Sequence, residues 1–426
     1  MFIMKKRLQL VNPMVFICLF TLISIQDCQV HQTPVIEDIA INDCWVSPLW
    51  GTNTSRFVRQ TDGTVWILGL EGKYPSTETV IYRRGNSSTW TEVKRIGGCY
   101  QPSVILLDDA DNLHILVNSL TDPIKHYKGV WTSDSLHISL VAEADWDDGG
   151  RGWYLGAGIF ENRIYLAFTS NDYDLWLTWK SLTEDTWSEP LRIFDGYVDP
   201  GGNHAMLYPR FVFSGETGYI MASHTSDGST YNFKDGVFLY SFQLNDPGTV
   251  VEEAIWSGRK GYDGYGFDMI LDHEGEVIVA YASGHHFYGE IDSSVGPDAI
   301  FTTKRQSDNV WVRTKIRPQR GFLSLSKDDK GNLYAFTTKA SYAEGLFIPY
   351  RSVDGGASWQ EVDGIPTADD FSATTIWAGL QGLQLGSSAE DRGANFPIYL
   401  AALLPDTTAL GLKRYQLRYT EWQVDE

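Results

Sequence analysis

The sequence predicts an all-β protein, a seven-bladed β-propeller closed by an N-terminal strand. The first observation is a repeat, in which a tight turn precedes a short apolar strand seven times along the chain. The second is spacing, because successive copies begin 48 to 65 residues apart, a period that fits one four-stranded blade. The third is a tryptophan-bearing turn downstream of most copies. Together they favour one repetitive domain over several average ones.

The second strand of each hairpin is the most regular part of the repeat. Its seven copies, each with the turn before it, are Asp62–Leu70, Asp111–Asn118, Asn162–Thr169, Thr217–His224, Gly275–Ala282, Gly331–Thr338 and Phe396–Leu403. A third strand follows in most units: Thr79–Arg83 before Trp90, Leu175–Lys180 before Trp187, and Ala299–Thr303 before Trp311. Turns alternating with short apolar runs are typical of antiparallel strands.

The two ends of the chain are expected to complete one blade together. The last unit, 376–422, supplies three strands at most. A segment near Val35–Val46 is predicted to add the missing outer strand, which would remove an open sheet edge. No linker or low-complexity stretch interrupts the repeats, so residues 31–426 are predicted to form a single domain.

The N-terminus has the order of charge and apolarity of a secretory signal. Lys5, Lys6 and Arg7 precede the apolar run Met14–Ile25, which is short for a membrane span. We therefore expect a signal peptide over residues 1–30 and a secreted or periplasmic protein. A buried N-terminal helix is one alternative. A lipoprotein anchor at Cys28 is another, disfavoured because the residues before it are not the small ones of a lipobox.

Composition limits the classes of partner. The formal charge is −20, which disfavours nucleic acid, and an acidic glycan would need a locally positive pocket. Aromatic residues make up 13% of the chain, a content often seen in secreted carbohydrate-active proteins because sugar rings stack on aromatic faces. Cys44 and Cys99 remain after the signal, and whether they pair is left open. A monomer without a membrane span is expected.

No cofactor is predicted, and calcium is a possible ligand. Three Asp-rich runs, 108–112, 272–275 and 328–331, resemble calcium loops, but each falls in the same hairpin turn of its unit, so solvated turns are the better interpretation. Asp145–Gly149 lies outside that register and is the better metal candidate. No clustered His and Cys spacing indicates zinc, and no metal ligand is assigned.

Potentially reactive side chains gather on one rim of the predicted propeller. A hairpin reverses direction, so the start of its first strand and the end of its second lie on one edge. In the fourth unit this edge carries His204, Tyr208, Arg210 and His224. The rim as a whole carries Trp50, Arg56, Tyr100, Arg151, Trp153, Tyr262, Tyr265, Tyr281, His285, His286, Arg320, Lys339 and Trp377. Such a set suits a glycan site, although any single aromatic could simply fill the channel mouth.

Several motifs resemble a known family. Ser352–Trp359 matches the Asp-box pattern S-x-D-x-G-x-[ST]-W. Tyr208–Phe211 with Ser226–Ser229, and Tyr100–His114 running on to Tyr127, resemble the BNR/Asp-box repeat propellers that include ulvan lyases and related uronate-cleaving polysaccharide lyases. The resemblance covers most of the mature chain at the level of repeats. It implies a seven-bladed propeller, an acidic polysaccharide or oligosaccharide as partner, and cleavage by β-elimination.

The resemblance also implies site residues, and this chain departs from most of them. The family's tyrosine falls on Tyr208, its arginine on His224, and its histidine pair on Tyr100 and Leu120. We therefore hypothesise a displaced site in the fourth and fifth units, with Tyr208 and His204 as the acid/base pair. His224 and Arg210 would contact the anionic group. Tyr100 could act as acid or base if a nearby cation lowered its pKa, and Arg151, Trp153, Tyr265 and His285 would bind substrate.

Two other classes of function stay open. Loss of the family's histidine pair is what a non-catalytic glycan-binding propeller would show. A sialidase-like glycoside hydrolase is the second, because Asp-boxes are common in sialidases. Only Phe347–Arg351 is similar to their R-I-P motif, in the wrong place and order.

Overall fold

A computed structural model gives the fold. The structure describes the following residues: 35–45, 55–85, 89–100, 103–119, 122–132, 134–144, 154–170, 174–196, 198–199, 202–226, 236–257, 267–283, 299–305, 311–317, 323–328, 330–338, 347–362, 384–385, 395–408 and 411–423. They all belong to one compact unit, Val35–Glu426. Within these residues the regular elements are strands, with no helix, and so none that is long and apolar enough to cross a membrane.

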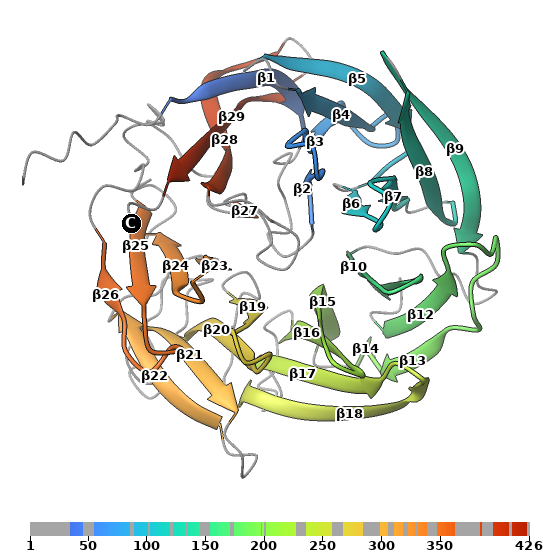
Figure 1. Ribbon diagram of the computed structural model, residues 1–426. Coiled ribbons are helices and arrows are strands. Elements are labelled where there is room, and N and C mark those ends of the chain that lie inside the picture. Colours follow the sequence, from blue (N-terminus) through green and yellow to red (C-terminus); the bar gives the residue numbers. More distant parts are fainter. Residues whose placement is uncertain are drawn as a thin grey trace, which may run out of the picture. The chain divides into compact units, whose positions relative to one another are not determined.

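The described strands pair into seven sheets, numbered here along the chain (Figure 1). The first sheet holds β2 (Phe57–Arg59), β3 (Val65–Glu71), β4 (Glu78–Arg84) and β5 (Trp90–Gly97). The second holds β6 (Val104–Leu107), β7 (Leu113–Val117), β8 (Ile124–Thr132) and β9 (Ser135–Ala144). The third holds β10 (Leu155–Phe160), β11 (Arg163–Thr169), β12 (Leu175–Ser181) and β13 (Leu191–Phe194).

The fourth sheet has five strands, β14 (Val198–Asp199), β15 (Gly202–Ser214), β16 (Thr217–Ser226), β17 (Gly236–Gln243) and β18 (Asp246–Ser257). The fifth holds β19 (Phe267–Leu271), β20 (Val277–Ser283), β21 (Ala299–Arg305) and β22 (Trp311–Arg317). The sixth holds β23 (Leu323–Lys327), β24 (Leu333–Thr338), β25 (Phe347–Ser352) and β26 (Gln360–Glu361). The seventh has the order β27 (Gln384–Leu385), β28 (Asn395–Thr407), β29 (Lys413–Gln423) and β1 (Glu37–Cys44).

Consecutive sheets meet along their first strands. β2 contacts β6, β6 contacts β10, and the series continues through β15, β19, β23 and β27. β1 of the seventh sheet contacts β3 and β5 of the first, so the order of contacts is cyclic. Apolar faces fill the space between sheets; Leu116 of β7, for example, shares one buried cluster with Leu166 of β11. The all-β propeller expected from the sequence is confirmed, and the count of seven blades stays a prediction.

The seventh sheet combines both ends of the described chain. β1 pairs antiparallel with β29, with Glu37 opposite Tyr419 and Cys44 opposite Lys413. This is the outer strand expected near Val35–Val46. Cys44 and Cys99 are both buried and are not joined in a disulfide, and burial raises the pKa of the Cys99 thiol to about 11.

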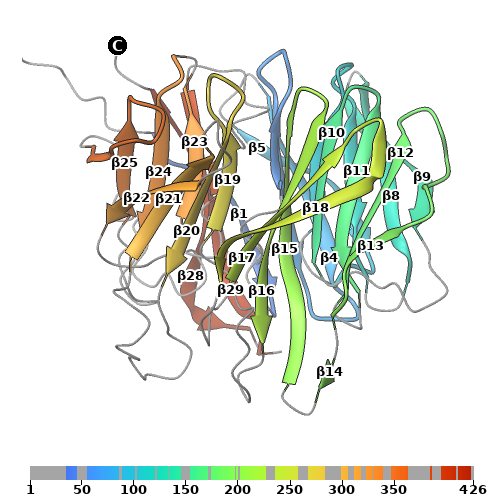
Figure 2. The same cartoon turned by 90° about the horizontal axis from the view of Figure 1, so that it is seen from below.

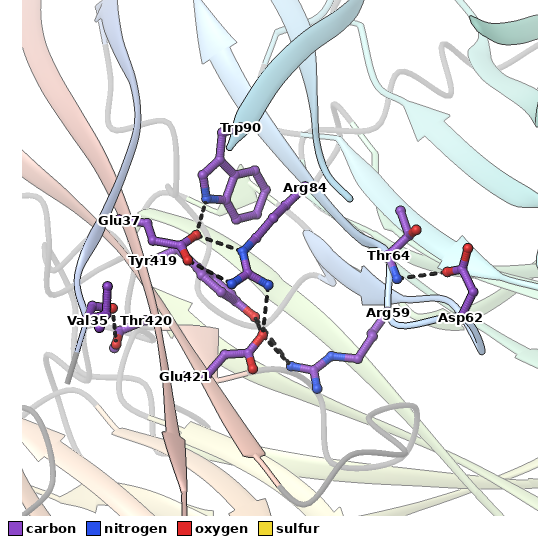
Figure 3. Close-up of polar contacts among 10 residues, drawn as sticks. All are labelled: Val35, Glu37, Arg59, Asp62, Thr64, Arg84, Trp90, Tyr419, Thr420 and Glu421. Carbon is purple, nitrogen blue, oxygen red and sulfur yellow. Dashed lines mark hydrogen bonds and ion pairs between the residues drawn. The ribbon is translucent and has the colours of Figure 1, made fainter. Parts of the chain in front are cut away.

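Ion pairs join the seventh sheet to the first (Figure 3). The Arg84 guanidinium donates to both carboxylate oxygens of Glu37 at 2.7 Å, and Trp90 Nε1 donates to the same carboxylate at 2.8 Å. Arg84 and Arg59 both lie 3.3 Å from Glu421 Oε1. We call these four charged residues the seam.

The Asp-rich hairpin turns use their carboxylates on the backbone. Asp108 Oδ1 accepts from the amide of Asn112 at 2.8 Å, Asp272 Oδ1 from that of Glu276 at 2.9 Å, and Asp328 Oδ1 from that of Asn332 at 2.7 Å. The same contact thus recurs in three sheets, which supports a turn-stabilising role. Asp145–Gly149 lies outside the described residues.

Candidate functional site

The fourth hairpin differs from the regular one that its sequence predicts. Its second strand, β16, runs two residues beyond the expected Thr217–His224, and β14 pairs beside the start of β15 (Figure 2). The pairing register shifts between Leu207 and Arg210. Such a bulge bends a strand and re-aims a side chain, and bulges are common next to active sites.

Tyr208 occupies this bulge in an unusual backbone conformation. Its φ is 55°, in the left-handed region, which is a true outlier for a bulky residue. Conformations of this kind cost about 1–3 kcal/mol and persist only where the surroundings enforce them. The side chain is 1% exposed, and its ring centroid lies 4.3 Å from that of Tyr154.

Gly156 of β10 makes room for the bulge. A Cβ atom at position 156 would lie 1.9 Å from the carbonyl oxygen of Pro209, far inside any allowed contact. Only glycine therefore lets the third sheet approach the backbone that follows Tyr208. The bulge depends on a residue of the neighbouring sheet.

Arg210 is held on the other side of the bulge, in a buried ion pair. Its Nε lies 2.7 Å from Asp268 Oδ1 of β19 and donates to the carbonyl oxygen of Met269 at 3.1 Å. The amide of Leu325 in β23 donates to Asp268 Oδ2 at 2.6 Å, so the contacts span three sheets. Burial raises the pKa of the Asp268 carboxyl, while Arg210 and the Leu325 and Met269 amides oppose that rise.

This placement bears on the role expected for Arg210. Its guanidinium was predicted to contact an anionic substrate group, but the side chain is only 10% exposed and lies between sheets with a carboxylate as partner. Substrate contact by Arg210 stays a prediction that this geometry does not favour. A structural role in fixing the strand after Tyr208 fits the contacts better.

The two histidines of the hairpin lie two rungs apart on its ladder. His204 pairs with Ser226, and His224 pairs with Met206. Positions 204 and 224 are therefore diagonal neighbours at the end of the hairpin that precedes Tyr208. Their side chains are outside what the structure describes, so their predicted roles remain predictions.

Tyr100 lies among aromatic residues. Its ring centroid is 5.4 Å from that of Trp45 and 5.4 Å from that of Tyr74. Burial, followed by the neighbouring phenols of Tyr154 and Tyr74, raises the pKa of Tyr100. The condition under which Tyr100 could act as a base, a pKa lowered by a cation, is not met here. The phenol is suited to donate a hydrogen bond or to stack.

Five aromatic residues lie after the ends of β1 and β3, before the starts of β6 and β10, and in the middle of β15. We call Trp45, Tyr74, Tyr100, Tyr154 and Tyr208 the aromatic row. All except Tyr208 are half-buried, as expected for side chains with an apolar body and a polar tip. Ring contacts connect Trp45 and Tyr74 to Tyr100, and Tyr154 to Tyr208.

Other predicted site residues cannot be placed. Arg151, Trp153, Tyr265, His285 and Leu120 lie outside the described residues. Within the described part of the chain, no three His, Cys, Asp or Glu side chains gather to hold a metal ion.

Sequence reasoning missed the residues that shape the bulge. The signal for Asp268 was a lone carboxylate in the apolar strand Phe267–Leu271, since a charge is rarely buried without a partner. Tyr154 directly precedes the first strand of the third sheet, β10. Tyr100 lies shortly before the first strand of the second sheet, β6. Nothing local singled out Gly156, because the backbone it admits belongs to another sheet.

The arrangement of the sheets defines an all-β propeller, and comparisons with solved structures agree. An ulvan lyase of polysaccharide lyase family PL25, solved bound to -[GlcA(1-4)Rha3S]-, is similar with a TM-score of 0.56 at 13% identity, over 89% of this chain and 96% of that one. Polysaccharide lyase Uly1 has a TM-score of 0.55 at 10% identity, over 87% and 90%. No protein-family model and no curated protein matches the sequence. At these identities the likeness shows the fold alone.

Proposed function

We propose that this protein is an exported carbohydrate-active propeller of seven blades that cleaves a uronate-containing glycan by β-elimination. The observation that carries the proposal is Tyr208, a bulky residue in a left-handed conformation, buried beside Tyr154 in the aromatic row. Strain of this kind gathers at functional sites. The motif resemblance around Tyr208 and the fold shared with the two lyases point to the same reaction class.

The reaction needs three groups. A base removes the proton on the carbon next to the uronate carboxylate, the electron pair forms a carbon–carbon double bond, and the bond to the leaving oxygen breaks as an acid protonates that oxygen. A cation or hydrogen-bond donor must stabilise the carboxylate as charge develops. Tyr208 and His204 are our acid/base pair, and because Tyr208 is only 1% exposed, the bulge must open for its phenol to reach the substrate. His224 is the group that meets the carboxylate when protonated.

The aromatic row supplies binding rather than proton transfer. Aromatic faces stack on sugar rings, and Tyr100, like an ordinary tyrosine, is neutral at physiological pH, with its pKa raised further by burial. We assign Tyr100 to substrate contact, together with Arg151, Trp153, Tyr265 and His285 as first predicted.

No cofactor is required by this scheme, and calcium at Asp145–Gly149 stays a prediction. The signal peptide over residues 1–30, the secreted or periplasmic location and the monomer also stay predictions.

A non-catalytic glycan-binding propeller is the second candidate. Three of the four positions implied by the resemblance carry a different residue, and Tyr100 lacks the lowered pKa that a base would need. The two candidates make opposite predictions for bond cleavage.

Purified protein incubated with uronate-containing glycans separates them. We expect ultraviolet absorbance from an unsaturated uronate, and its loss in His204→Ala/Tyr208→Phe. Full activity in that double variant would eliminate the site assignment while leaving the reaction class intact. Binding without absorbance or new reducing ends would favour the glycan-binding role, and new reducing ends without absorbance would indicate a hydrolase.

A further inference from the structure

In several sheets, a tryptophan near the start of the last strand donates a hydrogen bond to the sheet before its own. Trp90 Nε1 donates to Glu37 Oε2 at 2.8 Å, Trp311 Nε1 to Glu253 Oε2 at 3.0 Å, and Trp359 Nε1 to Thr302 Oγ1 at 3.0 Å. Each indole N–H therefore has a direct acceptor on the sheet before its own.

The third sheet departs from this rule. Trp187, between β12 and β13, meets His126 of β8 with ring centroids 6.0 Å apart. His126 stands where Thr302 stands in the fifth sheet, because each lies opposite the fourth residue of the second strand, Leu116 or Ala280. The equivalent direct bond is missing. Trp187 Nε1 and His126 Nδ1 are both buried, and neither has a hydrogen-bond partner in the described part of the chain.

The hydrogen bonds of His126 fix which of its nitrogens accepts. Asp108 Oδ2 lies 3.2 Å from His114 Nε2, so this nitrogen carries the proton and donates. His114 Nδ1 then accepts from His126 Nε2 at 2.9 Å. In the neutral ring His126 Nδ1 is left with a lone pair, which needs a donor.

The surroundings keep His126 neutral. The ring is 1% exposed. Burial, followed by electrostatic interactions with His114, Lys180 and Lys128, lowers the pKa of His126 to about 2. A buried donor on Trp187 and a buried acceptor on His126 therefore face the same interface without bonding each other.

We propose that one buried water molecule binds between the second and third sheets, accepting a hydrogen bond from Trp187 Nε1 and donating one to His126 Nδ1. Water can do both at once, and buried waters typically satisfy about three otherwise unpaired polar groups. The third partner is Lys180. Its ammonium lies 5.9 Å from the Trp187 ring centroid and donates to the carbonyl oxygens of Ser181 and Glu184, which leaves one of its three N–H donors for the water.

The water completes a continuous chain from the turn of the second sheet to the third. The chain runs from Asp108 through His114 and His126 to the water and then to Trp187. The contact through water takes the place of the direct hydrogen bond that the Trp359 indole makes. A small anion is the competing occupant, and it would require a proton on His126 Nδ1.

Nuclear magnetic resonance of the intact protein tests the proposal without any substitution. We expect a cross-peak between the Trp187 indole proton and a long-lived water, and ¹⁵N shifts that show His126 protonated at Nε2 alone. A high-resolution crystal structure should place that water about 2.7–3.2 Å from both nitrogens. An anion at this position, a doubly protonated His126, or a direct bond between the two rings would each overturn the proposal.

A matched pair of variants locates the signal. In Trp187→Phe the water cross-peak should be lost, whereas in Trp359→Phe, which removes a direct bond, it should remain. Persistence of the signal in Trp187→Phe would show that the water lies elsewhere. Should Trp187→Phe fail to fold, the cross-peak of the unsubstituted protein still decides the question.

Discussion

Two ion-pair systems join neighbouring sheets of this propeller, and they differ in burial and in what they surround. Arg210 and Asp268 are 10% and 3% exposed, and they flank the bulge of Tyr208. At the seam, Arg84 and Glu421 are 19% and 22% exposed, and the strands there carry register shifts near Asp38 and Tyr82. A buried pair gains stability only when every partner is satisfied, whereas a half-exposed pair is screened by solvent. The contrast suggests that the first system fixes a strained site and that the second closes the chain.

The largest expected effect is removal of Arg210. In Arg210→Met, Asp268 remains as a buried carboxylate without its cation, and breaking a buried pair in this way costs about 3–5 kcal/mol. The free energy of unfolding in urea should fall by that amount. In Arg210→Met/Asp268→Asn the loss should be smaller, because the amide keeps an acceptor for the Leu325 amide and carries no charge. A loss under about 1 kcal/mol in the single variant would show that the pair is not tight in solution.

Gly156→Ala tests the bulge itself. The added Cβ would meet the Pro209 carbonyl at 1.9 Å, and overpacking typically costs about 1–3 kcal/mol. The backbone around Tyr208 must also move, so any activity that depends on Tyr208 should fall with stability. Gly97→Ala is the matched control, because a Cβ there meets nothing within 4 Å. Equal stability of the two variants would mean that the third sheet does not hold the bulge.

The fold was more predictable than the site, for a physical reason. Strands such as β4 and β12 follow from local apolar patterns repeated along the chain, and they match the expected Thr79–Arg83 and Leu175–Lys180 within a residue at each end. The bulge was not foreseen, since it depends on Gly156 of another sheet.

The same limit applies to charges and to pKa values. Arg210 looked available because its partner, Asp268, lies in the next sheet. The pKa of Tyr100 is raised by burial and by phenols that are distant in sequence. Tyr208 lies in the fourth hairpin, where a local motif places it, but in the middle of β15 rather than at a strand start, and its role stays a prediction.

A third interface adds a dependence on pH. Burial lowers the pKa of both His114 and His126, and Asp108, Lys128 and Lys180 are the charged groups around them. The unfolded chain binds protons on these histidines near pH 6.5, whereas folded His126 does so only near pH 2. The contribution of these histidines to the free energy of unfolding is therefore fully present above pH 6.5. It falls as pH decreases below that value, by up to about 1.4 kcal/mol per pH unit for each histidine.

Unfolding in urea at a series of pH values checks this slope. His126→Gln removes one titrating group, so its stability should fall less steeply between pH 6.5 and pH 5 than that of the parent protein. Identical slopes would mean that His126 takes up its proton while folded. That result would also weaken the case for a bridging water, since the water requires a neutral ring.

The smallest expected effect is at the seam, where Glu421→Gln removes a carboxylate shared by Arg59 and Arg84. Exposed or half-exposed pairs contribute about 0–1 kcal/mol each, and salt screens them. Arg84 keeps Glu37 as a partner at 2.7 Å, and Arg59 keeps the Tyr419 hydroxyl as an acceptor at 3.3 Å, so neither arginine is left without an acceptor. We expect a loss of about 1 kcal/mol in dilute buffer that shrinks at 1 M salt, whereas the loss in Arg210→Met should persist there. A large, salt-independent loss in Glu421→Gln would show that the seam behaves as a buried system and would remove the contrast between the two.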